Sequence, residues 1–208
     1  AGTIECELLE NRLQHLLSIL KKLGPCKKHI MAIDDGVEEI LWAGDFVVVI
    51  ELGKLKSRNV MEGWLKHLQV CASSQQPSAS LVISRNSSSS KKDQFHIALQ
   101  WNPLSAIQAK EELMKLKAIA SHGLQHCWPI PPESGWAFAK ASHKDPSKGL
   151  TAFQQKWDGL FNVQGEKEAP EMQLCFGLNY QAQNFISNEV FKEAYSSLYK
   201  PLIQYLSD

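Results

Sequence analysis

The sequence predicts an α/β fold in which a mixed central sheet is flanked by helices and followed by a helical C-terminal portion. Leucines recur at alternating steps of four and three from Leu9 to Leu23, which is the spacing of one helix face. The run Val47–Ile50 is β-branched and apolar throughout, which is typical of a central strand covered on both faces. The order of helical and strand-like segments fits a mixed sheet with helices packed on it, because this arrangement buries the apolar faces of both.

Local signals place the individual elements. Gly24 and Pro25 end the first helix. Asn102 and Pro103 start a later one, because asparagine caps the first turn and proline lacks only a donor that has no helical partner there. Pro201 is expected to kink the last helix or to start a separate last turn. The other expected elements are strands at His29–Ile33, Glu39–Trp42, Phe46–Leu52, Leu81–Ser84 and Phe95–Trp101, and helices at Met61–Cys71, Trp136–His143, Leu150–Phe161 and Glu189–Leu206.

Length and charge limit the classes of protein that fit. The 208 residues carry 22 Lys+Arg against 22 Asp+Glu, and they favour a single domain over residues 1–208. A domain that gripped DNA alone would be expected to carry a positive excess, so balanced charge favours a module that works within an assembly. The start at Ala1 and Gly2 suggests a C-terminal fragment of a larger subunit with a short cloning remnant at 1–2, and segment 86–93 is expected to be a mobile loop.

The five cysteines are scattered along the chain, and no CxxC pair occurs among them. This spacing argues against a zinc ribbon or a dithiol redox site. An odd number of scattered cysteines is typical of reduced thiols in a cytosolic protein, so a cytoplasmic location is expected. No apolar run reaches the roughly 18 to 20 residues that a membrane-spanning helix needs.

One segment has a pattern typical of metal-dependent phosphodiester cleavage. Asp34 follows one short strand, and Glu51 ends a buried strand with Lys54 close behind it. Two carboxylates that hold Mg²⁺ and a lysine that orients water are what this chemistry needs. In nucleases of the PD-(D/E)xK type one residue separates the second acid from the lysine, so Gly53 occupies the lysine position here. Lys54 is displaced by one residue, and a one-residue slip turns a strand side chain to the opposite face.

The sequence therefore predicts a restriction-endonuclease-like, PD-(D/E)xK nuclease-like sheet with a degenerate site. Asp34, Glu51 and Lys54 are its vestigial catalytic candidates, and neither a cofactor nor a metal ion is expected. The alternative is an active nuclease that uses the same three residues with Mg²⁺. His122 and His126 are four residues apart and could share a metal, but the sequence offers no third ligand beside them, and histidines at a helix C-terminus favour the helix dipole.

Several short motifs occur in a fixed order from about residue 40 to the C-terminus. They are Gly53-Lys54-Leu55-Lys56-Ser57-Arg58 with Trp64-Leu65-Lys66-His67-Leu68, then Ser134-Gly135-Trp136-Ala137, Trp157-Asp158-Gly159, Gly165-Glu166, and Ala194 with Leu198-Tyr199-Lys200-Pro201-Leu202. The first pair resembles a "KLK…WL.HL" signature. Together the motifs resemble the C-terminal domain of the exodeoxyribonuclease V gamma chain, the RecC family.

This resemblance implies a non-catalytic domain of the RecBCD helicase–nuclease, which processes double-strand DNA ends for recombination and repair. In that family the domain has a nuclease-like fold, helps hold and split the duplex, and contacts the other subunits. The expected partners are RecB-like and RecD-like subunits and double-stranded DNA ends, with no membrane. A further alternative is a protein-interaction domain that does not touch DNA.

Lys54, Lys56 and Arg58 are the expected DNA-binding residues. Such charges would contact phosphates and position the duplex without reading its sequence. The alternative is that Lys54 and Arg58 pair with the nearby acids Glu51 and Glu62.

The last helix is the expected partner-binding surface. Tyr195, Tyr199 and Tyr205 lie on it, and tyrosine is enriched at protein interfaces. Packing in the core is the alternative for these tyrosines. A second basic group is expected to serve mainly the helix dipole at the end of the first helix, and its members are Lys21, Lys22, Lys27 and Lys28.

Overall fold

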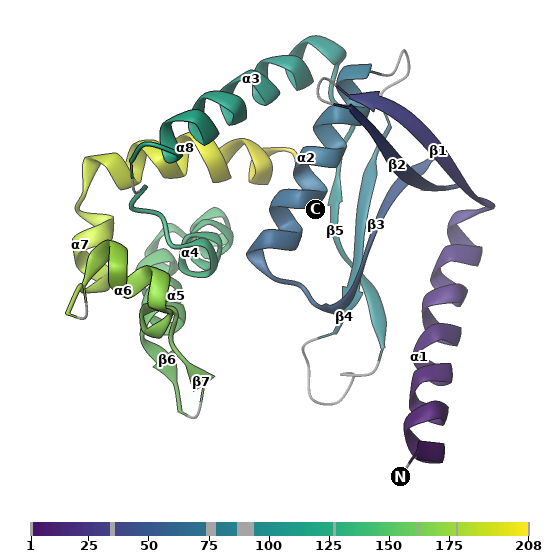
Figure 1. Cartoon of the computed structure of the whole chain (residues 1–208), viewed down its shortest axis with the longest axis horizontal. Coiled ribbons are helices and arrows are strands. Elements are labelled where there is room, and N and C mark those ends of the chain that lie inside the picture. Colours follow the sequence, from purple (N-terminus) through teal and green to yellow (C-terminus); the bar gives the residue numbers. More distant parts are fainter. Residues whose placement is uncertain are drawn as a thin grey trace. The chain divides into compact units, whose positions relative to one another are not determined.

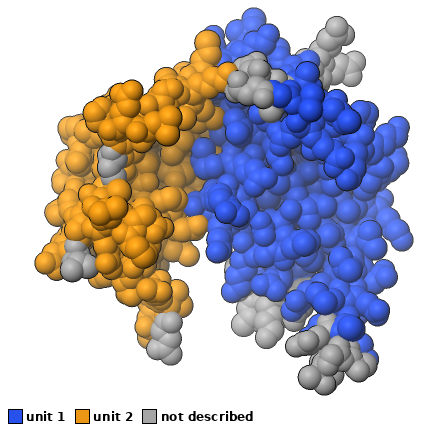
Figure 2. All heavy atoms as spheres, viewed as in Figure 1, with its two compact units in different colours: residues 1–113, 205–208 blue, residues 114–204 orange. Residues whose placement is uncertain are grey.

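The computed structural model describes residues 2–33, 36–73, 78–86, 94–126, 128–161, 163–177 and 179–207 (Figure 1). Asp34 and residues 87–93 of the expected serine-rich loop lie outside the described residues. The chain divides into two compact units, residues 1–113 with 205–208 and residues 114–204 (Figure 2). Helix α3 (Ala106–Gly123) contains the boundary between them. The single domain expected over the whole chain stays a prediction.

The first unit is built on a five-stranded mixed sheet in the order β1-β2-β3-β4-β5. Strands β3 and β4 run parallel, and the other neighbouring pairs run antiparallel. The predicted α/β class with a mixed sheet and helices is therefore confirmed. The elements are α1 (Gly2–Leu23), β1 (Cys26–Ile33), β2 (Gly36–Ala43), β3 (Phe46–Lys54), α2 (Ser57–Ser73), β4 (Ser80–Arg85) and β5 (Phe95–Trp101).

Strands β1 and β2 are longer than the sequence predicted. Lysines are depleted in strands, so Lys27 and Lys28 gave no strand signal, yet both pair across the hairpin with β2. Strand β2 then meets β3 through only two residue pairs, next to the turn that joins them. The remaining parts of β2 and β3 are not paired with each other, and this opening becomes important for the candidate site.

Helices α1 and α2 cover opposite faces of the sheet (Figure 1). Val47 and Val48 are neighbours in β3, and neighbouring side chains of a strand point to opposite faces. Val48 clusters with Leu16 and Leu20 of α1, whereas Val47 clusters with Val70 of α2. Coverage of both faces is the reason why the sequence of β3 is apolar throughout this stretch.

The second unit is helical around an aromatic core. Phe153, Trp157, Phe185 and Phe191 are almost fully buried there. The indole N–H of Trp157 donates to the carbonyl oxygen of Tyr180 at 2.9 Å, so its one polar group is satisfied. The elements are α4 (Pro132–Lys144), α5 (Gly149–Asp158), β6 (Gly159–Leu160), β7 (Val163–Gln164), α6 (Pro170–Phe176), α7 (Ala182–Ile186) and α8 (Glu189–Gln204).

A small hairpin, β6–β7, replaces the end of the helix expected at Leu150–Phe161. Helix α5 stops at Asp158 because Gly159 has a φ of 80°, which a side chain would strain. A Cβ at Gly159 would also lie 2.3 Å from the carbonyl oxygen of Val163 across the hairpin. Phe161 stands fully exposed at the turn.

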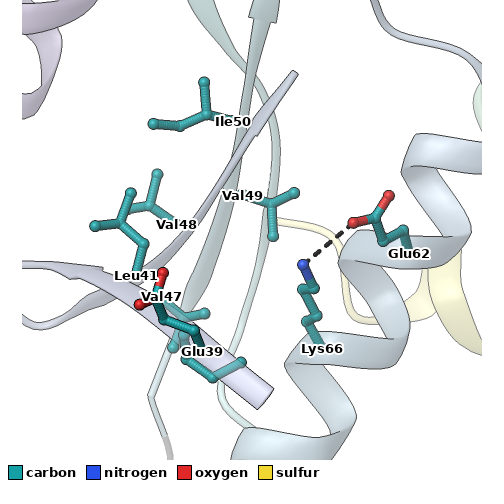
Figure 3. Close-up of a pocket in the computed structure, with 9 residues that line it drawn as sticks. Glu39, Leu41, Val47, Val48, Val49, Ile50, Glu62 and Lys66 are labelled. Atoms are coloured by element: carbon teal, nitrogen blue, oxygen red, sulfur yellow. Dashed lines mark hydrogen bonds and ion pairs between the residues drawn. The ribbon is translucent and has the colours of Figure 1, made fainter. Parts of the chain in front are cut away.

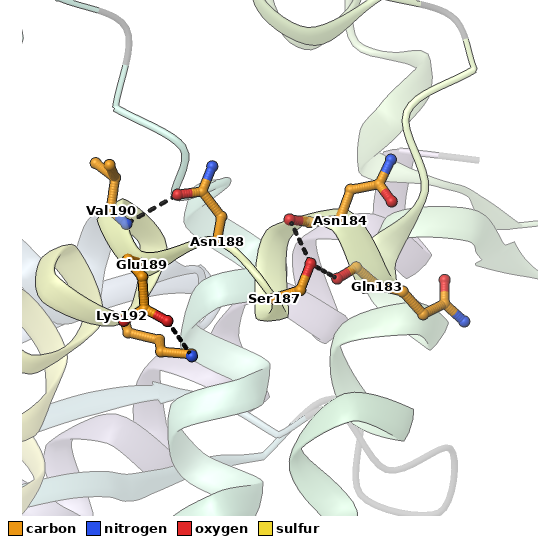
Figure 4. Close-up of polar contacts among 7 residues, drawn as sticks. All are labelled: Gln183, Asn184, Ser187, Asn188, Glu189, Val190 and Lys192. Atoms are coloured by element: carbon orange, nitrogen blue, oxygen red, sulfur yellow. Dashed lines mark hydrogen bonds and ion pairs between the residues drawn. The ribbon is translucent and has the colours of Figure 1, made fainter.

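The junction between α7 and α8 is held by local polar contacts (Figure 4). The Ser187 hydroxyl donates to the Gln183 carbonyl oxygen at 2.9 Å, and the Asn188 side chain accepts from the Val190 N–H at 2.8 Å. The latter bond caps the first turn of α8. Helix α8 runs on through Pro201 to Gln204, so the separate last turn that the proline suggested is not formed. Among the described residues, no helix is long and apolar enough to cross a membrane.

Candidate functional site

Glu51, the second acid of the nuclease-like pattern, is bound into the turn between β3 and α2. One carboxylate oxygen accepts from the Gly53 N–H at 2.7 Å, and the other accepts from the Asn59 side-chain amide at 2.5 Å. The Asn59 side-chain oxygen in turn accepts from the Lys56 N–H at 3.1 Å. Both oxygens of Glu51 are therefore engaged by N–H donors that hold the start of α2.

The residues after Glu51 form an irregularity in the sheet. Glu51 pairs with Ser84 of β4 and Lys54 pairs with Arg85, so the register shifts between them. Such a bulge redirects the side chains that follow it. A Cβ at Gly53 would lie 3.0 Å from the Glu51 carboxylate, so a lysine at this position would crowd the acid. The absence of a lysine at position 53 is visible in the sequence, whereas the bulge was not predicted.

Lys54, Lys56 and Arg58 all have exposed side chains around this turn. The alternative that Lys54 and Arg58 pair with Glu51 or Glu62 is not realised among the described residues, where no ion pair joins them to either acid. Glu62 pairs with Lys66 instead. The first turn of α2 contains no acidic residue of its own, and the Glu51 carboxylate bound to Asn59 is the negative group at this helix end, beside the three cations.

A cleft between β2 and β3 lies where the two strands are no longer paired (Figure 3). Its volume is about 190 Å³, and its lining includes Glu39, Glu62 and Lys66 beside the apolar side chains of β3. The Lys66 ammonium lies 3.2 Å from Glu38 and 3.1 Å from Glu62. Partial burial alone would lower the pKa of Lys66, but the hydrogen bonds and charges of Glu62 and Glu38 outweigh it and raise that pKa.

Sequence reasoning did not predict this ion-paired cleft. The spacing of Glu62 and Lys66, four residues apart on a helix, was a usable signal because such pairs face each other. Glu38 gave no such signal, because its contact with Lys66 depends on the packing of α2 against the sheet. Asp34, the first acid of the predicted site, lies outside the described residues, so Glu51 and Lys54 are the members that the structure places.

The motif Trp64-Leu65-Lys66-His67-Leu68 is largely internal. His67 is fully buried, and its Nδ1 lies 2.8 Å from the Ser80 hydroxyl. Its ring is stacked with those of Trp64 and Trp101, at centroid distances of 5.5 and 6.0 Å. Burial lowers the pKa of His67 from 6.5 to about 4, although a hydrogen bond to the Asn102 backbone opposes the shift. His67 is therefore a neutral core residue.

In the second unit, motif residues far apart in sequence meet at the start of α4. The Glu166 carboxylate accepts from the Glu133 N–H at 2.9 Å, the Ser134 N–H at 2.7 Å and the Ser134 hydroxyl at 2.6 Å. Burial raises the pKa of Glu166. The three hydrogen bonds from Glu133 and Ser134 act in the opposite direction, because they stabilise the charged carboxylate. The Tyr199 hydroxyl donates to the Pro132 carbonyl oxygen at 3.0 Å in the same region.

The three tyrosines expected at a partner surface lie in different environments. Tyr199 is 2% exposed and packs against Trp136, which favours the core-packing alternative for it. Tyr195 is partly buried against Phe138. Tyr205 belongs to the first unit and is stacked on Trp64 at a centroid distance of 6.0 Å.

Comparison with known proteins accounts for the motifs of the first unit and of α4. The family model of the RecC C-terminal domain matches residues 5–143, about two-thirds of the chain. The match includes the turn at Glu51, the buried His67 and the start of α4, whereas the motifs from Trp157 onward lie beyond it. No curated protein matches the chain. The chain belongs to the RecC C-terminal domain family.

Proposed function

We propose that this chain is a non-catalytic, nuclease-like domain of a RecBCD-type helicase–nuclease that acts as a scaffold and handles duplex DNA during double-strand-break repair. Membership of the RecC C-terminal domain family supports a role in such a complex. Its partners would be RecB-like and RecD-like subunits and the duplex end that the complex processes.

The sheet supports the nuclease-like part of the proposal. Helix α1 is followed by the antiparallel strands β1, β2 and β3, and α2 then crosses to the parallel strand β4. Glu51 lies in the second half of β3, beyond the residues of this strand that pair with β2. This is where the PD-(D/E)xK pattern requires its second acid.

The observation that carries the non-catalytic part is the engagement of Glu51. A carboxylate that binds Mg²⁺ must offer its oxygens to the ion. Here one oxygen faces the Gly53 N–H and the other faces the Asn59 amide, and such donors cannot ligate a cation. Gly53 also replaces the lysine that would orient water. Glu51 is therefore committed to hydrogen bonds that hold the turn, and the lysine of the PD-(D/E)xK pattern is missing beside it, which together favour a non-catalytic role.

The exposed cations around the same turn support contact with DNA. Lys54, Lys56 and Arg58 are exposed in the segment that leads into α2, and their charges would neutralise phosphates without reading sequence. With zero net charge, the chain would draw most of its DNA affinity from the assembled complex.

Reversing two of these charges tests the DNA-handling role. In the assembled complex, Lys54→Glu with Lys56→Glu is expected to weaken duplex-end binding about tenfold and to reduce the slope of log K against log salt by about 2, because two phosphate contacts are lost. The measurement is fluorescence anisotropy with a labelled duplex at several salt concentrations. Lys21→Glu with Lys27→Glu is the matched control, since it changes the net charge equally at another site. An unchanged slope in the Lys54 and Lys56 variant would instead support the interaction domain that does not touch DNA.

A further inference from the structure

The outer edge of β5 already accepts an added strand at one end. Strand β5 is the last strand of the sheet, and β4 occupies its inner side. At its C-terminal end Trp101 forms an antiparallel bridge with Leu206. The Ser207 N–H donates to the Gln100 carbonyl oxygen at 2.8 Å, and the Asn102 N–H donates to the Tyr205 carbonyl oxygen at 2.9 Å. Backbone groups on this edge are therefore oriented for antiparallel pairing.

The other half of β5 borders a groove. In the described part of the chain, no strand pairs with the outer side of residues 95–99. Between this half and α1 lies a groove of about 320 Å³, whose apolar lining consists of Ile19, Leu23, Phe95 and Ile97. Ile97 is 42% exposed on it. An unpaired edge strand beside a helix with apolar residues is the arrangement that domains use to bind an extended peptide as an additional strand.

The polar residues of the groove are all basic or neutral. They are His15, Lys22 and His96, and no acidic side chain is among the described residues that line it. The Nδ1 atom of His15 is buried without a hydrogen-bond partner in the described structure. Carboxylates on an incoming chain would meet the Lys22 ammonium with no acidic side chain of the lining to repel them, and complementary charge of this kind selects the partner.

We propose that this groove binds an extended acidic segment of a partner protein, which pairs antiparallel with Phe95–Leu99. Every second side chain of the added strand would face α1, so an apolar residue on that side would pack on Ile19 and Ile97 and a carboxylate on the same side would reach Lys22. A nucleic-acid backbone could use the lysine, but it has no N–H groups to pair along β5 and gains nothing from the apolar lining. This inference does not depend on the DNA-handling role.

A defined peptide tests the proposal on the whole 208-residue chain. The probe is a fluorescein-labelled peptide of about nine residues in which valine and glutamate take turns on the side that faces α1, with threonine at the positions between them. Lys22→Glu is expected to raise its Kd about tenfold, because a close charge pair becomes repulsive. Lys21→Glu is the matched control on the same turn of α1, outside the groove, and is expected to change the Kd less than twofold. Binding is expected to protect the amides of residues 95–99 from hydrogen exchange.

Two altered probes separate strand addition from simple charge attraction. Methylation of alternate peptide nitrogens removes the donors that would pair with β5, so it is expected to abolish binding. Ile97→Lys places a charge on the edge strand and is expected to weaken binding as strongly as Lys22→Glu does. The proposal is overturned by a lack of saturable binding, by equal effects of Lys21→Glu and Lys22→Glu, or by tight binding of the methylated peptide. Competition by oligothymidine with the same dependence on Lys22 would assign the groove to nucleic acid and would also overturn it.

Discussion

Replacing Glu166 with alanine is expected to lower the free energy of unfolding of the second unit by about 3 kcal/mol. The substitution leaves two N–H groups and the Ser134 hydroxyl at the start of α4 without their acceptor. Ser134 is fully buried, so water cannot replace the lost bonds easily. A buried donor without a partner costs about 1 to 3 kcal/mol, and bonds to a charged group lie at the upper end.

Hydrogen exchange of the α4 amides measures this effect where it arises. Protection of α4 is expected to fall about a hundredfold, which corresponds to about 3 kcal/mol. Glu168→Ala is the matched control, because Glu168 is exposed in the same short turn and its side chain holds no helix end. Glu166→Gln keeps one of the two acceptor oxygens, so the protection of α4 in this variant is expected to lie between those of Glu166→Ala and Glu168→Ala. Equal protection in Glu166→Ala and Glu168→Ala would contradict the capping role.

Acidification from pH 6.5 to pH 4 is expected to destabilise the first unit by about 3 kcal/mol through His67 alone. The pKa of His67 is about 4 in the folded chain, against 6.5 for an ordinary histidine. Between these values the unfolded chain takes up a proton that the folded core excludes, so stability is lost as the pH falls. Below about pH 4 both states are protonated, and this contribution stops changing.

Urea titrations at several pH values between 7 and 4 measure this dependence. Carboxylates also titrate in this range, so the informative quantity is the difference in stability between the wild type and His67→Gln. The glutamine side chain does not titrate at any of these pH values. The variant is expected to be less stable at pH 7, because a buried hydrogen bond to Ser80 is altered, but to lose less stability on acidification. His143→Gln, at an exposed histidine, is expected to behave like the wild type. If the free energy of unfolding of the wild type and of His67→Gln depended on pH in the same way, His67 would take up its proton equally in the folded and the unfolded chain. That result would contradict the lowered pKa.

Elements with a clear period were predictable from the sequence. The leucine spacing of α1 and the β-branched run of β3 placed both elements, because burial on one helix face or on both strand faces fixes which residues are apolar. The β6–β7 hairpin was missed because its strands are two residues long and carry no period. Of the two outcomes expected at Pro201, the separate last turn is not formed, because α8 continues through the proline to Gln204.

The candidate site was predictable in its residues but not in its bonds. The spacing around Glu51 identified a displaced lysine, and Gly53 stands where the nuclease pattern needs one. The use of Glu51 as the acceptor for Gly53 and Asn59 depends on the path of the turn into α2, which no local pattern specifies. The same holds for Glu166 and Ser134, which are 32 residues apart and meet only in the folded unit.

Most of the motif residues have structural roles in the folded chain. Within the matched region, His67 and Trp64 fill the core between α2 and the sheet, and Ser134 at the start of α4 is held by Glu166, which lies beyond the match. These roles maintain the fold and require no chemistry. Lys54, Lys56 and Arg58 are the cations of the first motif that are exposed to solvent, where a duplex could reach them.

The most direct test of the account is a cleavage assay on the chain and on the assembled complex with Mg²⁺, using duplex and single-stranded DNA. We expect no Mg²⁺-dependent cleavage by the chain. We also expect Glu51→Ala to leave the nuclease activity of the complex unchanged per assembled particle, because both Glu51 oxygens serve the turn at Gly53 and Asn59. Glu62→Ala is the control for loss of a different acid, one that lines the cleft between β2 and β3. Cleavage by the chain that requires Mg²⁺ and disappears in Glu51→Ala would contradict the account and establish an active nuclease.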